Sequence, residues 1–322
     1  MTNSETTNNE IRRGKLEERG TVTTPTVGIA NHRFAFGYYR QTFWNWLIGT
    51  AFFLGGLGAG LFVLALLTGH TAGMVVGYLI VVVGKNTAHM LFLGRPERFW
   101  RAAMRPDRSW IARGIWAMGF FALSGLILLL PRVLGASWRL PDPINSAATA
   151  IAILSAVVIM FYDGLVMNSS PGVAFWRTRL LPLLLLMYAT LGGATLSLTI
   201  RELRGEATPA FLPTLERALL LINFVLLAVY LARMNRSLPA ARETLRQWLR
   251  GPYARAFFGL VVVVGLLATL LLSMVQNHLQ ATGLVLLIAA CELTGDFTLM
   301  MVLLKSGLFP LQTAPAYVPR GL

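Results

Sequence analysis

The sequence has little charge, little histidine and a single cysteine, and each scarcity excludes a class of protein. Only 13% of the 322 residues are charged and 55% are hydrophobic, whereas about a quarter of the residues in soluble domains are charged. A soluble enzyme is therefore excluded. With Cys291 alone, the chain has no disulfide framework and no Cys-x-x-Cys pair for zinc or an iron–sulfur cluster. Any metal chemistry must come from a partner, and we assign no catalytic residue and no metal ligand to this chain.

Eight apolar stretches follow a polar N-terminal segment, and each is close to the length of about 20 residues that crosses a bilayer. They span residues 43–67, 72–93, 110–130, 144–167, 179–200, 211–233, 254–276 and 281–304. The predicted fold is an all-α integral membrane protein, an eight-transmembrane-helix bundle with both termini on the same side. We divide the chain into a partly disordered polar tail over 1–42, a transmembrane domain over 43–310 and a C-terminal tail over 311–322.

Positive charge is divided unevenly between the two sides of the predicted bundle. The formal net charge is +14, from 28 Lys and Arg against 14 Asp and Glu, but the hydropathy favours membrane topology over nucleic acid as its cause. Connections on the side of the tail have 21 of the basic residues, and the opposite side has four, namely Arg132, Arg139, Arg201 and Arg204. Because cytoplasmic loops are enriched in Lys and Arg, both termini are predicted in the cytoplasm.

Three further patterns indicate how the helices pack and where they meet the membrane boundary. Residues 238–250 place Leu238, Leu245, Leu249 and Trp248 near one another, which predicts a short interfacial amphipathic helix. Gly56 and Gly60 form a small-xxx-small surface, which favours close helix packing over a binding site. Tryptophans near the predicted membrane boundaries are expected to serve first as interfacial anchors, namely Trp44, Trp46, Trp100, Trp110, Trp176 and Trp248.

Three of the predicted spans contain ionisable or polar residues, which are costly inside a bilayer and therefore mark candidate functional sites. The second span has Lys85, Asn86 and His89, the fourth ends in Tyr162 and Asp163, and the eighth has Glu292 and Asp296. The rise of about 1.5 Å per residue places Glu292 near mid-membrane and the other charges in the cytoplasmic half. The alternative is purely structural: Lys85 pairs with Glu292 or Asp296 to hold two helices together.

Haem binding, a Schiff base and ion transport are weaker interpretations of these intramembrane groups. Haem binding usually needs two axial ligands that face each other across a bundle, and His89 is the only histidine expected at depth. Lys85 as a Schiff-base lysine remains an alternative. Glu292 and Asp296 can form a proton path, which we weigh against a structural pairing. The chain shows no internal repeat of the kind found in many secondary transporters, which counts against an ion-coupled transporter without excluding it.

The connection between the second and third spans is unusually rich in arginine and tryptophan. Such a surface suits either an acidic partner protein or anionic lipid headgroups. Its candidate docking residues are Arg95, Arg98, Arg101, Arg105, Arg108, Trp100 and Trp110.

The same connection resembles the signature of the NrfD/polysulfide reductase family of membrane subunits. The resemblance rests on 93–96, 100–102 and 109–110 in this connection, and on 52–60, 162–164 with 171–176, and 292–296 elsewhere. It covers about residues 40 to 310. It implies an eight-helix anchor in a prokaryotic inner membrane that reacts with menaquinone or ubiquinone and has no haem or iron–sulfur cluster of its own. It also implies a four-cluster ferredoxin-like iron–sulfur subunit as partner, and a molybdopterin or hydrogenase-type catalytic subunit behind it.

The resemblance also implies where the quinone binds, and the sequence departs from the family pattern there. Family members contact the quinone through an Asn and a His of the first helix and a Tyr at the end of the fourth, and Tyr162 matches the last. The other two positions fall on Ile48 and Ala51. Either Asn45 or His32 substitutes, or the headgroup is held by Tyr162, Asp163, His89, Lys85 and Asn86, or the chain is a structural anchor that binds no quinone.

The iron–sulfur subunit of the family docks on the face that bears the connection between the second and third helices. In this chain that face is the basic one, which the charge rule places in the cytoplasm. The resemblance therefore implies a cytoplasm-facing member, such as a sulfite-, formate- or hydrogenase-linked type.

Overall fold

The computed structural model describes residues 27–29, 32–34, 38–135, 141–279 and 281–310. Most of the tail 1–42, the whole tail 311–322, both termini and Arg139 lie outside the described residues, and no side chain is described for His32.

Within the described residues, eight helices are long and apolar enough to cross a membrane, so the predicted all-α eight-helix fold is confirmed. The eight spans are α2 (Trp46–Leu67), α3 with η1 and α4 (Thr71–Leu79, Ile80–Lys85, Asn86–Phe92), α5 (Trp110–Val133), α6 (Asp142–Asn168), α7 (Leu180–Arg204), α8 (Phe211–Asn235), η3 with α10 (Ala256–Ala268, Thr269–Leu279) and α11 (Thr282–Lys305). The short helix α9 (Pro239–Leu249) lies between α8 and η3 in the sequence. A further short 3₁₀ segment, η2 (Pro96–Ala103), lies between α4 and α5.

Local sequence signals explain where several helices begin and end. Asn45 precedes α2, and its Oδ1 accepts a hydrogen bond from the Leu47 amide at 2.9 Å. Ser109 does the same for α5, because its Oγ accepts from the Ala112 amide at 3.3 Å. Such side chains satisfy amides that have no partner in the first helical turn. Gly205 ends α7 in the left-handed conformation, with φ of 63°, which glycine adopts without steric cost.

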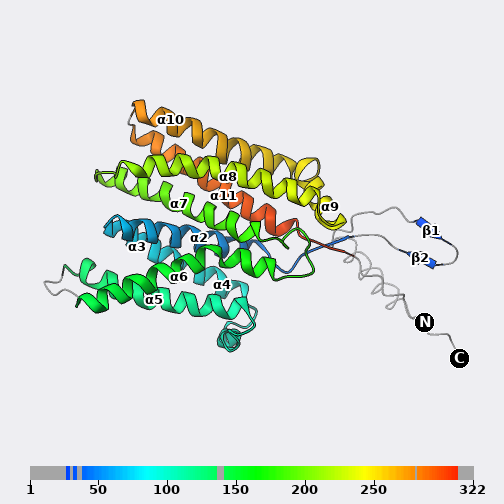
Figure 1. The fold of residues 1–322 in the computed structure, drawn as a ribbon, viewed down its shortest axis with the longest axis horizontal. Helices are drawn as coiled ribbons and strands as arrows, with labels where there is room; N and C mark the ends of the chain where they lie inside the picture. The colour runs from blue at the N-terminus through cyan, green and yellow to red at the C-terminus, as the bar shows by residue number, and fades with distance from the viewer. Residues whose placement is uncertain (1–26, 30–31, 35–37, 136–140, 280, 311–322) are drawn as a thin grey trace, which may run out of the picture.

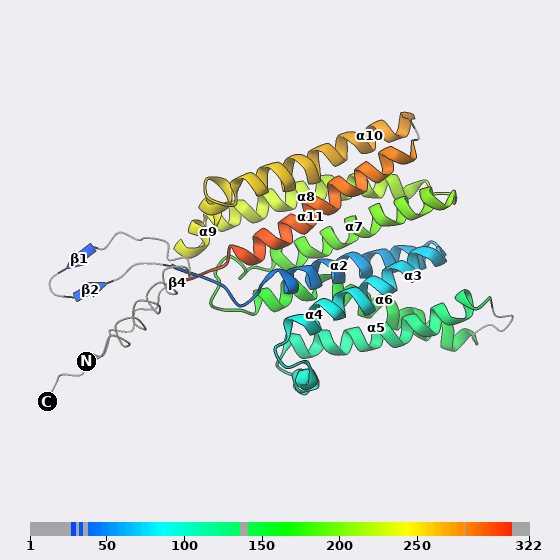
Figure 2. The ribbon, with the colours of Figure 1, turned by 180° about the vertical axis from the view of Figure 1, so that it is seen from behind.

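The chain enters and leaves the helical bundle at the same end. Strand β3 (Tyr38–Arg40), which lies within the segment expected to be a tail, pairs antiparallel with β4 (Leu308–Pro310) directly after α11. Figures 1 and 2 show this strand pair, α9 and η2 at one end of the bundle. A second pair, β1 (Val27–Ile29) with β2 (His32–Phe34), is also antiparallel. We call the end with β3, β4 and η2, where the sequence predicts a docking surface, the docking end, and the other the far end.

Helices α2 and α7 form the centre of the bundle and approach each other closely. The backbones meet at Gly60 and Gly193, because a Cβ added to Gly193 would lie 2.5 Å from the Leu61 amide nitrogen. Gly56 lies on the same face, where an added Cβ would reach the Ala189 Cβ at 3.1 Å. The predicted packing role of Gly56 and Gly60 is therefore confirmed.

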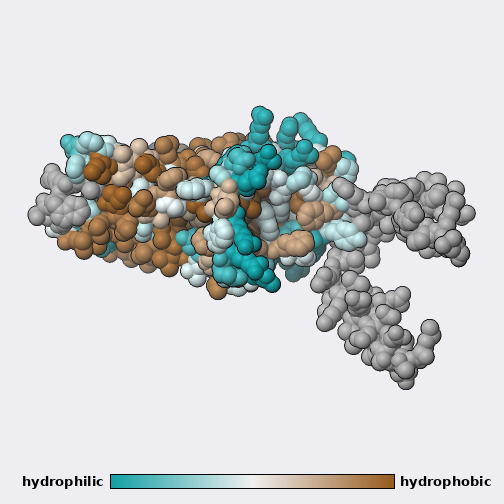
Figure 3. All heavy atoms as spheres, turned by 90° about the horizontal axis from the view of Figure 1, so that it is seen from below, coloured by the Kyte–Doolittle hydropathy of each residue, from teal (hydrophilic) through white to brown (hydrophobic). Residues whose placement is uncertain are grey.

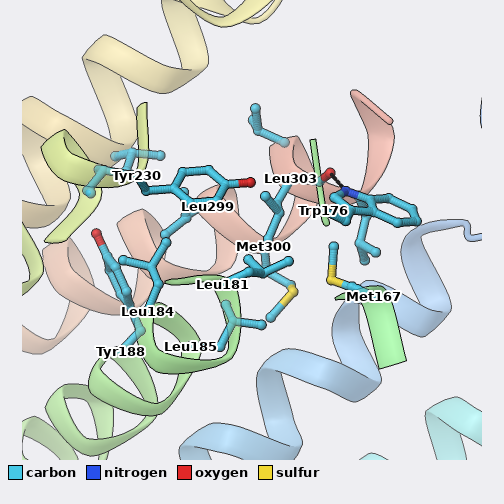
Figure 4. Close-up of a cluster of buried hydrophobic side chains, with 14 of the residues drawn as sticks. Met167, Trp176, Leu181, Leu184, Leu185, Tyr188, Tyr230, Leu299, Met300 and Leu303 are labelled. Atoms are coloured by element: carbon cyan, nitrogen blue, oxygen red, sulfur yellow. Dashed lines mark hydrogen bonds between the residues drawn. The ribbon is translucent and has the colours of Figure 1, made fainter. Parts of the chain in front are cut away.

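The apolar core extends to the docking end and includes two tryptophans that we expected at the membrane boundary. Trp176 is 2% exposed and its Nε1 donates to the Leu303 carbonyl at 2.9 Å, as Figure 4 shows. Trp248 of α9 is fully buried and its Nε1 donates to Ser306 Oγ at 2.7 Å. The expectation of an anchoring role was wrong for these two residues, because α9 and the segment before α7 pack on the bundle instead of facing lipid.

Candidate functional site

The first buried polar group is an ion pair between Lys85 and Asp163. Lys85 ends the π-helical segment η1 and is fully buried, and Asp163 of α6 is 1% exposed. Lys85 Nζ lies 3.4 Å from Asp163 Oδ1 and also donates to the Ala51 carbonyl at 3.4 Å. The sequence-based alternative that Lys85 pairs with Glu292 or Asp296 was wrong, because Asp163 supplies the carboxylate.

Aromatic rings surround the ammonium group of this pair. Lys85 Nζ lies 5.4 Å from the ring centre of Tyr162 and 5.5 Å from that of Phe52, which are distances at which the ring face attracts a cation. The Phe52 ring in turn lies 6.1 Å from the His89 ring. Gly55 makes room for the lysine, because a Cβ there would lie 2.7 Å from Lys85 Cδ. Lys85, Asp163, Tyr162, Phe52 and His89 form what we call the lysine site.

The remaining residues expected near a quinone are less central. Asn86 Nδ2 donates to the Val82 carbonyl of its own helix at 3.0 Å, and His89 Nδ1 lies 3.3 Å from the Lys85 carbonyl. Asn45 caps α2 at an exposed position instead of pointing into the bundle. Ala51, one of the two positions where the resemblance predicts a polar contact to quinone, is buried, and its carbonyl accepts a hydrogen bond from Lys85.

The second buried polar group consists of three carboxylic acids. Glu292 is fully buried and Asp296 is 8% exposed, and both come from α11. Glu216 of α8 is 3% exposed, and its two oxygens accept from Thr195 Oγ1 at 3.1 Å and from Ser273 Oγ at 2.8 Å. The charge of the neighbouring Arg217 acts on Glu216, whereas Glu292 and Asp296 have no salt bridge in the part of the chain that the structure describes. We call Glu216, Glu292 and Asp296 the acid cluster.

Glu292 is the least satisfied member of the acid cluster. Neither of its oxygens has a donor at hydrogen-bond geometry, although Thr195, Asp296 and Glu216 all lie beside it. The hydroxyl of Tyr188, which faces the same two α11 acids, is also buried without a hydrogen-bond partner. Since buried polar groups are almost always paired, a carboxyl surrounded only by hydroxyl and carboxyl groups is a candidate for a role other than structural glue.

Sequence reasoning missed Glu216, although it lies near the predicted start of a span. Glu216 points into the bundle, whereas its neighbour Arg217 is half-buried and its Nε donates to the Pro213 carbonyl at 3.1 Å. The signal that could have found Glu216 is its spacing from Leu219 and Leu220, three and four positions further on, which places the carboxylate on an apolar helix face.

Cavities lie on both sides of the acid cluster. A cavity of about 40 Å³ has both Asp163 and Asp296 in its wall, together with Phe52 and Tyr188. A second, of about 280 Å³, has Glu216 in its wall and extends to Glu202 at the far end of α7. The small cavity has room for only a few water molecules. The acids and cavities thus follow one another from the lysine site toward the far end.

The predicted docking residues lie on η2 and the turn after it. Arg95, Arg98, Arg101, Arg105, Arg108 and Trp100 are exposed, and Trp110 is half-buried at the start of α5. Some of this charge is compensated locally, because Arg105 and Arg108 both contact Asp107, at 3.6 and 3.3 Å. Figure 3 shows hydrophilic residues gathered here, beside the apolar surface of the helices.

At the far end, His70 joins the loop after α2 to the loop after α7. His70 is 3% exposed, and its Nε2 lies 3.2 Å from Glu206 Oε2. Burial, followed by the charge of Arg201, lowers the pKa of His70 below its usual 6.5, while Glu206 opposes this shift. A hydrogen bond from Arg204 lowers the pKa of Glu206.

These features define a multi-pass helical membrane protein with ionisable groups in its interior and a basic surface at one end. The model of the family described as "Polysulphide reductase, NrfD" matches residues 36–311, so the chain belongs to this family, as its motifs indicated. It is a membrane subunit of the type found in respiratory oxidoreductases, and members of the family associate with iron–sulfur and molybdopterin subunits. No curated protein sequence matches the chain.

Proposed function

We propose that this subunit exchanges electrons between a partner iron–sulfur subunit and menaquinone or ubiquinone, and that the quinone headgroup reacts at the lysine site. The observation that carries the proposal is the buried Lys85–Asp163 pair with Tyr162 and Phe52 around it, in a chain of this family. The partner is a four-cluster ferredoxin-like subunit that docks on η2, with a molybdopterin or hydrogenase-type subunit behind it. The docking end faces the cytoplasm of a prokaryotic cell.

The chemistry of the lysine site suits quinone reduction. A quinone takes two electrons and two protons to become a quinol, and its oxygens become strongly basic as the electrons arrive. The ammonium of Lys85 stabilises that charge, and the Tyr162 hydroxyl or His89 donates a proton beside it. Electrons come from or go to the partner's clusters, so this chain needs no cofactor of its own.

Quinone binding requires the lysine site to open. The cavity beside Asp163 measures about 40 Å³, whereas ligand pockets usually measure about 300–1,000 Å³. The Phe52 ring, which lines this cavity, must therefore move when a headgroup enters. Gly114 faces the Tyr162 ring, since a Cβ there would lie 2.6 Å from Tyr162 Cζ, so the ring is held by close packing with α5.

Photolabelling of the intact complex with an azido-quinone tests where the quinone binds. We expect labelled peptides from the docking-end halves of α2 and α6, and a large loss of label in K85M/D163N, which removes both charges together. The matched control is R132Q, at the far end of α5. An amount of label that is unchanged in K85M/D163N, or that excess quinol does not reduce, would contradict the proposed site and favour a structural anchor.

A second function, proton transfer, is favoured by the acid cluster. Glu292 and Asp296, extended by Glu216, connect the lysine site to the cavity at the far end. Buried carboxyl groups without cations are tolerated when protons neutralise them, which is the property that a proton path needs.

Proteoliposomes that contain the complex test the proton path through E292Q. We expect quinone turnover to continue at a reduced rate and proton movement per electron to fall. Thr294, which is exposed on the same helix, gives the control T294V. Unchanged turnover and unchanged proton movement in E292Q would exclude the path. Proton or ion movement without any electron donor would instead support a transporter.

A further inference from the structure

An apolar groove runs along the outer surface between α5 and α6 and is separate from both polar clusters. Its volume is about 590 Å³, and its walls include Trp110, Trp116, Phe120, Leu154 and Val158. Trp116, Phe120 and Leu154 are more than half exposed, at 51%, 51% and 67%. The groove therefore opens toward the lipid instead of the interior of the bundle.

The docking end of this groove carries positive charge. Arg113 lines the groove, and its guanidinium stacks over the Trp110 ring at 4.4 Å from the ring centre. Its Nε donates to the Pro106 carbonyl at 2.8 Å and an Nη to the Asp107 carbonyl at 3.0 Å. A guanidinium has five N–H donors, so among the described residues these two bonds leave donors for another acceptor.

The turn over residues 105–108, next to the groove, has more positive than negative charge. Arg105 and Arg108 share the single carboxylate of Asp107, and their side chains are 65% and 79% exposed. With Arg113, this corner has three guanidinium groups and one carboxylate. The turn is also fixed to the groove, because Trp116 Nε1 donates to the Ala103 carbonyl of η2 at 3.1 Å.

We propose that this groove binds one anionic phospholipid. The phosphate lies against Arg113 and Arg108, and an acyl chain lies in the groove between α5 and α6. Charge complementarity selects the lipid: three guanidinium groups attract an anionic headgroup, and the largely apolar walls accept an acyl chain. The lipid then supports η2 and the turn after it, at the level where the hydrophilic and apolar surfaces meet (Figure 3). This proposal does not depend on quinone binding.

Native mass spectrometry of the full chain tests it, with phosphatidylglycerol and phosphatidylcholine of identical acyl chains as probes. We expect the chain to retain one phosphatidylglycerol in preference to phosphatidylcholine. R113Q reduces that retention about fivefold, from the cost of losing one arginine near a headgroup. L154W fills the groove without touching the arginines and reduces retention of both lipids. Added salt lowers the preference for the anionic lipid.

Matched controls lie away from the groove. R132Q removes an arginine at the far end of α5, and L221W adds a tryptophan on α8 at a position that is 54% exposed; neither changes retention. Equal retention of the two lipids, or a preference that survives both R113Q and L154W, would overturn the proposal. Loss of bound quinone in place of phospholipid in L154W would also overturn it and assign the groove to the quinone.

Discussion

The lysine site and the acid cluster are both buried in the membrane domain, but their charges are handled differently. Lys85 and Asp163 lie 3.4 Å apart, so each charge has an opposite partner. Glu292 and Asp296 have no salt bridge among the described residues, whereas Glu216 accepts from two hydroxyl groups and is influenced by the charge of its neighbour Arg217. A buried pair can hold a fixed charge distribution, whereas carboxyl groups without a close cation depend on protons. We therefore expect a fixed field at the lysine site and proton exchange at the acid cluster.

Removing one partner of the lysine site is the strongest way to break this comparison. D163N keeps the side-chain shape but leaves a buried ammonium without its carboxylate. We expect a loss of about 3–5 kcal/mol in unfolding free energy, measured by thermal or denaturant unfolding in detergent. The double variant K85M/D163N should recover most of this loss. A D163N protein as stable as the wild type would show that the pair is not a charge pair in the membrane.

Crowding the lysine without changing any charge gives a smaller effect. In G55A, the new Cβ would lie 2.7 Å from Lys85 Cδ, so the lysine side chain must shift. Overpacking of this kind costs about 1–3 kcal/mol, and quinone turnover should fall with it. The control is G119A, since nothing lies within 4 Å of a Cβ at that position. Equal behaviour of the two variants would mean that the position of Lys85 is unimportant.

An ionisable pair outside the bilayer sharpens the comparison through pH. Because the pKa of His70 lies below 6.5 in the fold, the unfolded chain binds more protons in acid, and stability should decrease as the pH falls below about 6.5. The lowered pKa of Glu206 acts in the same direction near its usual 4.5. Wild type should therefore lose more stability than H70N as the pH falls through this range. Parallel curves would contradict a buried neutral His70.

Replacing the acids of the cluster by amides should affect stability least. E292Q resembles a protonated glutamic acid in shape and charge, so we expect a change below about 1 kcal/mol. The same chemical replacement therefore separates the two regions, since D163N is expected to be severe and E292Q mild. A large destabilisation in E292Q would mean that Glu292 is ionised and structurally paired.

The spans could be predicted from the sequence because length and hydropathy alone define them. The predicted boundaries at 43 and 281, for example, differ by only a few residues from the observed starts at Trp46 and Thr282. The rotation of each helix about its axis could not be predicted in the same way, and this rotation decides which side chains meet.

The partner of Lys85 illustrates this limit. The helical rise predicts similar depths for Asp163 and Asp296. Only the packing of α2 between the other helices brings Asp163 within reach of the Lys85 ammonium. The predicted anchoring roles of Trp176 and Trp248 were wrong for the same reason, since a position near the boundary does not tell whether a ring faces lipid or core. Glu216 was also missed, because a position near the start of a span does not tell whether the side chain points into the bundle.

The most direct test of the central claim is to isolate the native complex in mild detergent and follow the absorbance of the partner's iron–sulfur clusters after adding quinol or quinone. We predict that the clusters change oxidation state in the wild type and in R132Q, and that they respond far more slowly in K85M/D163N. A complex without such clusters, or one whose clusters respond equally fast in K85M/D163N, would contradict electron transfer to quinone at the lysine site.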